Sequence, residues 1–386
     1  MHPSPRRLLL AAVALCVAAP AVQAQTAPRP EPRVASRESI AAAPDRKIDP
    51  HARLALAPDG SGHVLMASIG TAGGPPTLVE LVSFDRAGKT TGRRTIASFS
   101  AEHFSLAEAQ LLRLPSGELL VATPDPNFAG RPGHGALLRL SADGKVLHRA
   151  PIHPPHDVPA PDRNPTFHFQ FNKMVSTSDG NVVVGGNYGL GPSNWWWGKF
   201  TPNGLRLAEQ TAKTFFLSTV DALAPTPDGG FRMVSRDLRG EISDMVLLRH
   251  SATGARQSRT VLLEKSESHQ AAFTSDGRIV VVKYEEPNRL LIFSPEGRLL
   301  KEMPWASPAD WWIVQVVSDG TGVVLQEQSQ RADFPSLLIR LDRDGGVVWQ
   351  TPQGLYLDAV SHGPEIVALV LEDEGKTATI VRLVNP

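Results

Sequence analysis

The chain has 386 residues, in which 39 lysines and arginines are balanced by 39 aspartates and glutamates. Because no excess of basic residues is available to neutralise phosphates, we expect no nucleic-acid partner. The length is sufficient for a large core, and the single cysteine, Cys16, means that no disulfide is expected within the chain.

The first 24 residues have the pattern of a secretory signal peptide. Arg6 and Arg7 precede an apolar run from Leu8 to Ala19, and Val22 and Ala24 are the small residues that signal peptidase requires. The apolar run is too short to favour a membrane anchor, so we expect no membrane span. Cleavage after Ala24 would release a periplasmic or secreted protein.

Residues 25–47 are rich in alanine, proline and charged residues, and this composition is typical of a linker. From residue 48 to residue 386, short apolar runs alternate with two classes of glycine-containing turn. The first class has its glycines at Gly60, Gly117, Gly180, Gly229, Gly277, Gly320 and Gly363. The second class falls between them, with Gly88, Gly144, Gly204, Gly254, Gly297 and Gly345. Each turn between two apolar runs predicts a β-hairpin, because glycine supplies the positive φ that tight hairpins need.

Two hairpins per repeat predict four strands per repeat. The first-class glycines are separated by 57, 63, 49, 48, 43 and 43 residues, and about seven such repeats are typical of a β-propeller. The final repeat has room for only three strands, so we expect a strand between Arg33 and Ala42 to complete it and close the ring. The predicted fold class is an all-β, seven-bladed β-propeller closed by N- and C-terminal strands, with six blades as the alternative.

These repeats resemble those of the broad superfamily of bacterial exported seven-bladed propellers, such as the TolB-like and quinoprotein-like ones. The resemblance covers nearly the whole chain after the signal peptide and rests on architecture and turn motifs. It implies the fold and carries no active site with it.

Three consecutive tryptophans occur in the stretch SNWWWGKFTPNG. Trp197 lies seven residues before a second-class glycine, and the equivalent position in the other five repeats is always leucine. We therefore expect Trp197 to pack between blades, with Gly198 beside it leaving room for the ring. The positions equivalent to Trp195 are mixed, so this ring is a candidate for ligand stacking together with Tyr188, although a packing role is equally compatible.

The segments that enter the innermost strands are expected to meet at one mouth of the central channel, where propeller ligands usually bind. They contribute Glu102, His103, His168, Gln170, Asn172, Asp221, His269, Gln270, Asp310, Trp311, Trp312 and Asp358. From this set, His103, His168, Asp221, His269, Trp311 and Trp312 are the predicted ligand-binding residues. Histidines here could act as acids and bases or hold a metal, but channel histidines are often simple polar liners, and we expect neither metal nor cofactor.

Three functions remain open. The preferred one is an exported propeller that binds a small molecule, a glycan or an envelope protein on its loop-rich mouth face. The second is a propeller enzyme, a lyase or hydrolase acting on glycans or lactones through His103, His168 or His269. The third is a docking platform within an envelope assembly, which would present apolar patches away from the channel axis.

Overall fold

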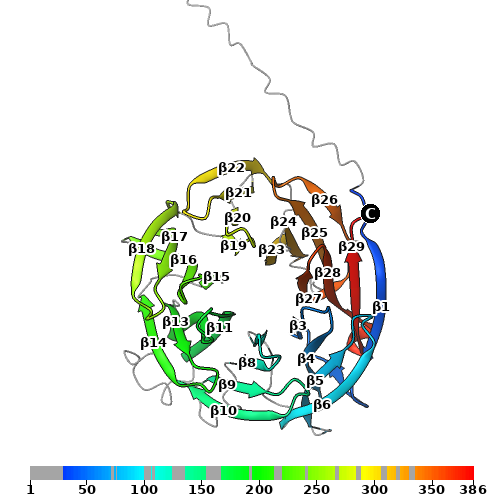
Figure 1. The fold of residues 1–386 in the computed structure, drawn as a ribbon. Helices are drawn as coiled ribbons and strands as arrows, with labels where there is room; N and C mark the ends of the chain where they lie inside the picture. Colours follow the sequence, from blue (N-terminus) through cyan, green and yellow to red (C-terminus); the bar gives the residue numbers. More distant parts are fainter. Residues whose placement is uncertain are drawn as a thin grey trace, which may run out of the picture.

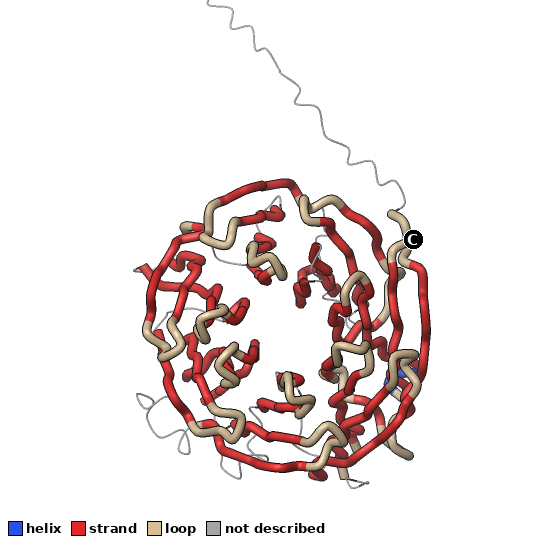
Figure 2. Tube along the Cα trace, in the orientation of Figure 1, coloured by secondary structure: helices blue, strands red, loops and turns tan. Residues whose placement is uncertain are grey.

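The computed structural model describes residues 29–70, 74, 76–99, 106, 109–123, 135–153, 167–190, 194–212, 220–239, 242–265, 269–283, 288–305, 311–318, 322–329 and 335–386. Within these residues the chain is a ring of seven antiparallel β-sheets around a central opening (Figure 1). The seven-bladed fold predicted from the turn spacing is confirmed, and the six-bladed alternative is excluded. Figure 2 shows strands throughout, and the only described helical residues form the short 3-10 turn Asp373–Gly375.

Each blade runs from an innermost strand at the channel to an outermost strand at the rim. Blade 1 contains β3 (Arg53–Leu56), β4 (Gly62–Ile69), β5 (Thr77–Phe84) and β6 (Thr90–Phe99), and β2 (Lys47–Ile48) extends its inner edge. Blade 2 contains β7 (Gln110–Arg113), β8 (Leu119–Thr123), β9 (Gly135–Leu140) and β10 (Val146–Ile152). Blade 3 contains β11 (Phe167–Ser176), β12 (Val182–Leu190), β13 (Asn194–Phe200) and β14 (Arg206–Ala212).

Blades 4 to 7 repeat this order. Blade 4 contains β15 (Val220–Pro225), β16 (Phe231–Arg239), β17 (Ile242–His250) and β18 (Arg256–Leu263), and blade 5 contains β19 (His269–Phe273), β20 (Ile279–Lys283), β21 (Arg289–Phe293) and β22 (Leu299–Pro304). Blade 6 contains β23 (Trp311–Ser318), β24 (Gly322–Ser329), β25 (Ser336–Asp342) and β26 (Val347–Gln350). Blade 7 contains β27 (Leu355–His362), β28 (Glu365–Glu372) and β29 (Thr377–Val384) from the C-terminus, and β1 (Arg33–Ala41) from the N-terminal region.

The two classes of turn occupy the positions that the sequence indicates. First-class turns join the first and second strands of a blade, second-class turns join the third and fourth, and both therefore lie on one face, the turn face. Gly180, with φ of 80°, and Gly204, with φ of 80°, illustrate why glycine is needed in the two classes. Gly320 lies outside the described residues. The opposite face is called the mouth face below.

The ring is closed by pairing between the two ends of the chain. β1 runs antiparallel to β29, with Arg33 opposite Val384 and Ala41 opposite Thr377. Ile40 is 3% exposed and packs into a core shared by blades 7 and 1. The closing strand expected between Arg33 and Ala42 is thereby confirmed, and β1 covers the edge that β29 would otherwise leave open.

The three tryptophans fill both faces of blade 3. Trp196 packs toward blade 2 against Phe169 and Phe171, with ring centroids 5.0 and 5.9 Å away. Trp195 and Trp197 point the opposite way, into the core shared with blade 4. Because side chains alternate between the two faces of a strand, consecutive aromatic rings fill two different interfaces.

The predicted packing role of Trp197 is confirmed, because this side chain is 1% exposed. The expectation that Gly198 leaves room for the ring of Trp197 is wrong, however, because the space beside Gly198 is filled by other rings. A Cβ atom at Gly198 would lie 2.7 Å from Cζ2 of Trp196 and 2.6 Å from Cε2 of Phe200. Residues 196, 198 and 200 share one face of β13, so the missing side chain accommodates Trp196.

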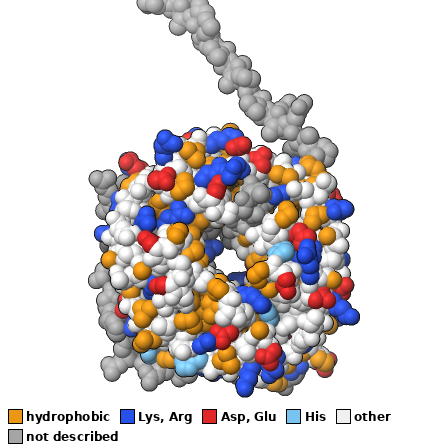
Figure 3. Space-filling model, viewed as in Figure 1, with side chains coloured by type: hydrophobic (Ala, Val, Ile, Leu, Met, Phe, Trp, Pro, Cys, Tyr) orange, Lys and Arg blue, Asp and Glu red, His pale blue; other side chains and the backbone are white. Residues whose placement is uncertain are grey.

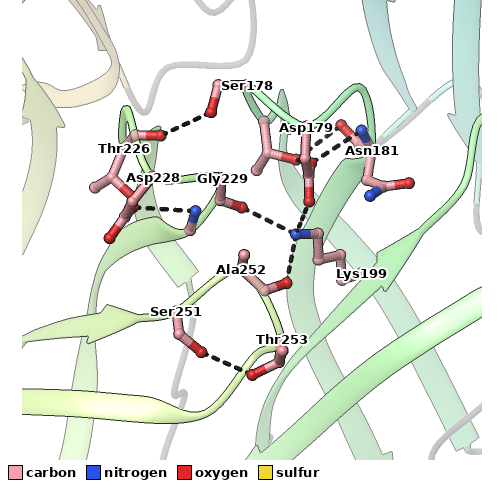
Figure 4. A network of polar contacts seen from close by, with 12 residues as sticks. Ser178, Asp179, Asn181, Lys199, Thr226, Asp228, Gly229, Ser251, Ala252 and Thr253 are labelled. Atoms are coloured by element: carbon pink, nitrogen blue, oxygen red, sulfur yellow. Dashed lines mark hydrogen bonds and ion pairs between the residues drawn. The ribbon is translucent and has the colours of Figure 1, made fainter.

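Blades 3 and 4 are joined on the turn face by Lys199, a lysine that is 1% exposed (Figure 4). Its Nζ donates hydrogen bonds to Oδ2 of Asp179 at 2.6 Å, to the carbonyl of Gly229 at 2.9 Å and to the carbonyl of Ala252 at 2.6 Å. The first partner belongs to blade 3 and the other two to turns of blade 4. One buried cation therefore fixes the two blades relative to each other.

Candidate functional site

The strand register places one equivalent residue from each innermost strand around the channel. In blades 1 to 6 these residues pair with the fourth residue of the described ladder in the second strand, counted from the turn face, and in blade 7 the residue chosen pairs with the fifth, Leu369. They are Arg53, Gln110, Lys173, Ala222, Gln270, Gln315 and Asp358. Six of the seven are polar or charged, and we refer to the set as the polar ring.

Four of the innermost strands carry a β-bulge next to their polar-ring residue. The register shifts fall between Phe171 and Lys173, Val220 and Ala222, Ile313 and Gln315, and Tyr356 and Asp358. Each bulge inserts one extra residue, namely Asn172, Asp221, Val314 and Leu357. Because a bulge breaks the alternation of a strand, it redirects the neighbouring side chains, as bulges near functional sites often do.

Two polar-ring side chains tie neighbouring innermost strands together. Arg53 donates from Nε to the carbonyl of Ala109 in the next blade at 2.9 Å, and from Nη1 to the carbonyl of Ala52 at 3.2 Å. Gln110 donates from Nε2 to the carbonyl of Phe171 at 3.0 Å, again in the next blade. Part of the polar ring is therefore structural.

Asp358 is 5% exposed and is fully engaged by its neighbours. Its Oδ2 accepts a hydrogen bond from the backbone N–H of Leu54 at 2.7 Å, and Oδ1 accepts from Nε2 of Gln315 at 2.8 Å and from the N–H of Ala359 at 2.9 Å. Burial raises the pKa of this carboxyl, while the charge of Arg53 and these hydrogen bonds act in the opposite direction.

Lys173 is a charged polar-ring residue whose burial is not compensated by contacts with the described residues. Its side chain is half-buried, and Nζ makes no hydrogen bond and no ion pair to the described residues. Burial lowers the pKa of Lys173 from its usual value, and the charge of Arg53 lowers it further. The carboxylates of Asp221 and Asp358 oppose this shift without contacting the ammonium group.

A cavity of about 850 Å³ lies inside the ring at the level of these residues. Figure 3 shows the central opening, with Lys or Arg side chains at its rim. The polar part of the wall includes Arg53, Gln110, Asn172, Lys173, Gln315 and Asp358. The apolar part includes Leu54, Leu111, Met174, Leu223, Leu357 and Val360. The volume lies within the range of sites for small organic ligands.

Several predicted site residues cannot be placed fully. His103 lies outside the described residues. His168 lies in β11 opposite Gly189, and His269 is the first residue of β19 opposite Lys283, but their side chains are not described. The same holds for Trp312 in β23. The predicted convergence of three imidazoles therefore stays a prediction, and among the described residues no group of three or more metal-ligating side chains is found.

Burial argues against direct ligand contact for three other predicted residues. Trp195 is 1% exposed, Tyr188 is 3% exposed and Trp311 is 8% exposed. All three belong to cores between blades, where their rings contact aliphatic and aromatic neighbours. Packing explains their size and position without a ligand.

Asp221 is a predicted ligand-binding residue whose charge acts on the candidate site. It is 4% exposed, occupies the bulge of β15 and acts electrostatically on Lys173. It is not part of the cavity wall. Asp358, also expected near the channel, does line the cavity.

Arg53 and Lys173 were missed by the sequence-based selection, which concentrated on histidines and aromatics near the mouth. A signal was present, because Arg53, Gln110, Lys173 and Gln270 each lie seven residues before a first-class glycine. Four of the repeats therefore align a polar residue at one position of the innermost strand. Only the strand register shows that this position surrounds the channel.

Comparison with solved structures finds other propellers. BBS1N, in a complex with ARL6DN, is similar over 93% of this chain and 98% of that chain, with a TM-score of 0.54 and 10% identity. The propeller domain of the Trilobed protease from Pyrococcus furiosus, described as having an open velcro topology, is similar over 86% of this chain and 93% of that chain, with a TM-score of 0.51 and 11% identity. The likeness is one of fold alone.

A puromycin hydrolase is also similar, with a TM-score of 0.53 and 14% identity over 86% of this chain and 52% of that enzyme. This chain therefore corresponds to about half of the hydrolase. No family model and no curated protein matches the sequence. The chain is a seven-bladed β-propeller, and these likenesses show its fold without assigning a family.

Proposed function

We propose that this chain is an exported binding propeller whose ligand enters the central channel from the mouth face. The observation that carries the proposal is the cavity of about 850 Å³ at the polar ring. Its wall combines charged groups, amides and aliphatic side chains contributed by several blades. A concave, mostly apolar site with a few convergent polar groups is the usual form of a small-molecule site.

Export is part of this proposal and is supported by the N-terminal signal pattern. The described residues contain no helix long and apolar enough to cross a membrane. Cell fractionation of the producing organism should place the protein outside the cytoplasm, with Gln25 as the first residue of the mature chain. An intact residue 1 on a cytoplasmic protein would contradict export.

A protein partner is compatible with the same fold, since BBS1N is a propeller in complex with ARL6DN. The cavity of this chain, however, lies within a closed ring, where a small ligand fits better than the surface of a folded protein. The enzymatic alternative depends on histidine side chains that the structure does not describe, so it receives no support from the described contacts.

Binding in the channel can be tested by filling it. Leu357 is the extra residue of the bulge in β27 and lines the cavity, so Leu357→Trp should occupy ligand space. Leu207→Trp is a matched control, because Leu207 lies on the outermost strand β14 and is 49% exposed.

The two variants and the unmodified protein would be screened against a library of small molecules by thermal unfolding. A true ligand raises the unfolding temperature by mass action on the native state. We expect such compounds to stabilise the unmodified protein and Leu207→Trp but not Leu357→Trp. Compounds that stabilise all three proteins equally would show that the channel is not their site.

A further inference from the structure

The cavity wall contains hydrogen-bond donors that the protein itself does not use. The ammonium group of Lys173 has three N–H donors and no hydrogen-bond partner among the described residues. Arg53 uses Nε and Nη1 for backbone carbonyls, whereas its Nη2 makes no hydrogen bond within the described part of the chain. Two cationic side chains therefore present unused donors to one cavity.

The acidic groups near the cavity do not cancel these cations. Asp358 is the only carboxylate in the described wall, and both of its oxygens already accept hydrogen bonds. Asp221 lies outside the wall, although its charge acts on Lys173. The accessible charge in the wall is therefore positive, which favours an anionic ligand.

The rest of the wall limits what kind of anion fits. Leu111, Leu355, Leu357 and Val360 contribute partly exposed aliphatic surface to the same cavity. A ligand with an apolar body gains affinity in this space by removing apolar area from water. A small inorganic ion such as phosphate would leave that surface exposed. A singly charged carboxylate with an apolar body satisfies both parts of the wall.

We propose that the channel binds a small organic carboxylate with an aliphatic body, whose carboxylate is held by Lys173 and Arg53. This inference rests on the proposed function, since it specifies the chemistry of the ligand that the channel takes. Charge-assisted hydrogen bonds from an ammonium or guanidinium group to a carboxylate are stronger than neutral ones and fix the orientation of the ligand.

Octanoate, octanol and inorganic phosphate are suitable probes, because the first two share a body and the first and third share negative charge. Their affinities would be measured by titration calorimetry with the unmodified chain, Lys173→Met, Leu357→Trp and Lys89→Met. Lys89 lies on the turn face, is exposed and makes no side-chain hydrogen bond to the described residues, so its substitution is the matched control for the loss of one lysine.

Octanoate should bind more tightly than octanol or phosphate. Lys173→Met should weaken octanoate by about tenfold or more, because a charge-assisted hydrogen bond is lost, and should leave octanol unchanged. Lys89→Met should behave as the unmodified chain does, and Leu357→Trp should weaken both octanoate and octanol. Circular dichroism and thermal unfolding would establish that each variant is folded.

Two other results would separate the two proposals. If octanoate and octanol bind equally, insensitive to Lys173→Met but blocked by Leu357→Trp, the carboxylate inference is overturned and the channel remains a binding site. If Leu357→Trp affects neither probe and no library compound, both proposals fail. Phosphate binding as tightly as octanoate would show that the site recognises charge without an apolar body, and would also overturn the inference.

Discussion

The Nζ atom of Lys199 lies 2.6 Å from Oδ2 of Asp179, and the lysine side chain is 1% exposed. The same ammonium group donates to the carbonyls of Gly229 and Ala252 in the neighbouring blade. Burial alone would raise the pKa of Asp179, but hydrogen bonds from Lys199, Thr177 and Asn181 hold it well below its usual value. The three acceptors therefore compensate the ammonium group of Lys199 for its lost hydration, and the same hydrogen bonds join the two blades.

Substituting Lys199 with methionine should destabilise the protein strongly. The change keeps the length of the side chain but leaves one carboxylate and two carbonyls without their donor. We expect a loss of about 3 kcal/mol, at the low end of the range for breaking a buried ion pair, because Asp179 retains some contact with water. Urea unfolding measures this loss, and Lys89→Met should change stability by less than about 0.5 kcal/mol.

Because His250 is buried, we expect the protein to lose stability in mild acid. The ring is buried against Phe231, with centroids 4.6 Å apart and planes at 12°, and its Nδ1 has no hydrogen-bond partner among the described residues. Burial lowers the pKa of His250 from 6.5 to about 4. Its contribution is fully present above pH 6.5 and is lost as the pH falls toward 4, because the unfolded chain binds the proton more readily. The effect amounts to roughly 3 kcal/mol.

The control for this pH dependence is His250→Phe. Phenylalanine occupies the equivalent position, four residues before the second-class glycine, in three other blades, as Phe84, Phe200 and Phe293. The variant should fold and should lose less stability than the unmodified chain between pH 6.5 and pH 4. Equal losses in urea unfolding over this interval would assign the acid sensitivity to other groups.

Trp195 and Trp197 should be equally important for stability. Both are 1% exposed and belong to the core between blades 3 and 4. Each substitution by alanine should cost about 3 to 5 kcal/mol through loss of packing. A far smaller loss for Trp195→Ala in chemical unfolding would favour the ligand-facing role that its sequence position suggested.

The affinity for octanoate should fall at alkaline pH, and the fall should begin at a lower pH than the pKa of an ordinary lysine would predict. Binding requires the charged form of Lys173, and burial together with Arg53 lowers the pKa of this group, with Asp221 and Asp358 acting in opposition. Affinity is therefore lost as the pH rises through a value below the ordinary lysine pKa of about 10.4. Lys173→Arg should bind octanoate without this decline, because a guanidinium stays charged. Titrations at several values between pH 7 and pH 10 would measure the difference.

The sequence was sufficient for the fold because the decisive features are local and repeated. Glycines such as Gly60 and Gly88 specify turns through their backbone conformation, and the count of turns sets the number of blades. The closing strand followed from a repeat with one strand too few. The partner of Gly198 could not be inferred in the same way, since it depends on which rings share a face of β13.

The candidate site was harder to predict because it depends on register across seven strands. Asp358 and Asp221 were expected near the channel, but their different access to the cavity follows from bulges in β27 and β15. Lys173 was missed because a lysine in a strand that also carries His168, Gln170 and Asn172 resembles a surface residue until the ring is closed. Aromatic residues such as Trp195 attracted attention by size, which is equally a property of cores.

The most direct test of the central claim is a crystal structure of the protein grown with saturating octanoate. We predict the ligand inside the channel, with its carboxylate within hydrogen-bond distance of Nζ of Lys173 and its aliphatic body against Leu111 and Val360. Octanoate bound only outside the ring, or a channel that holds only water at that concentration, would contradict it.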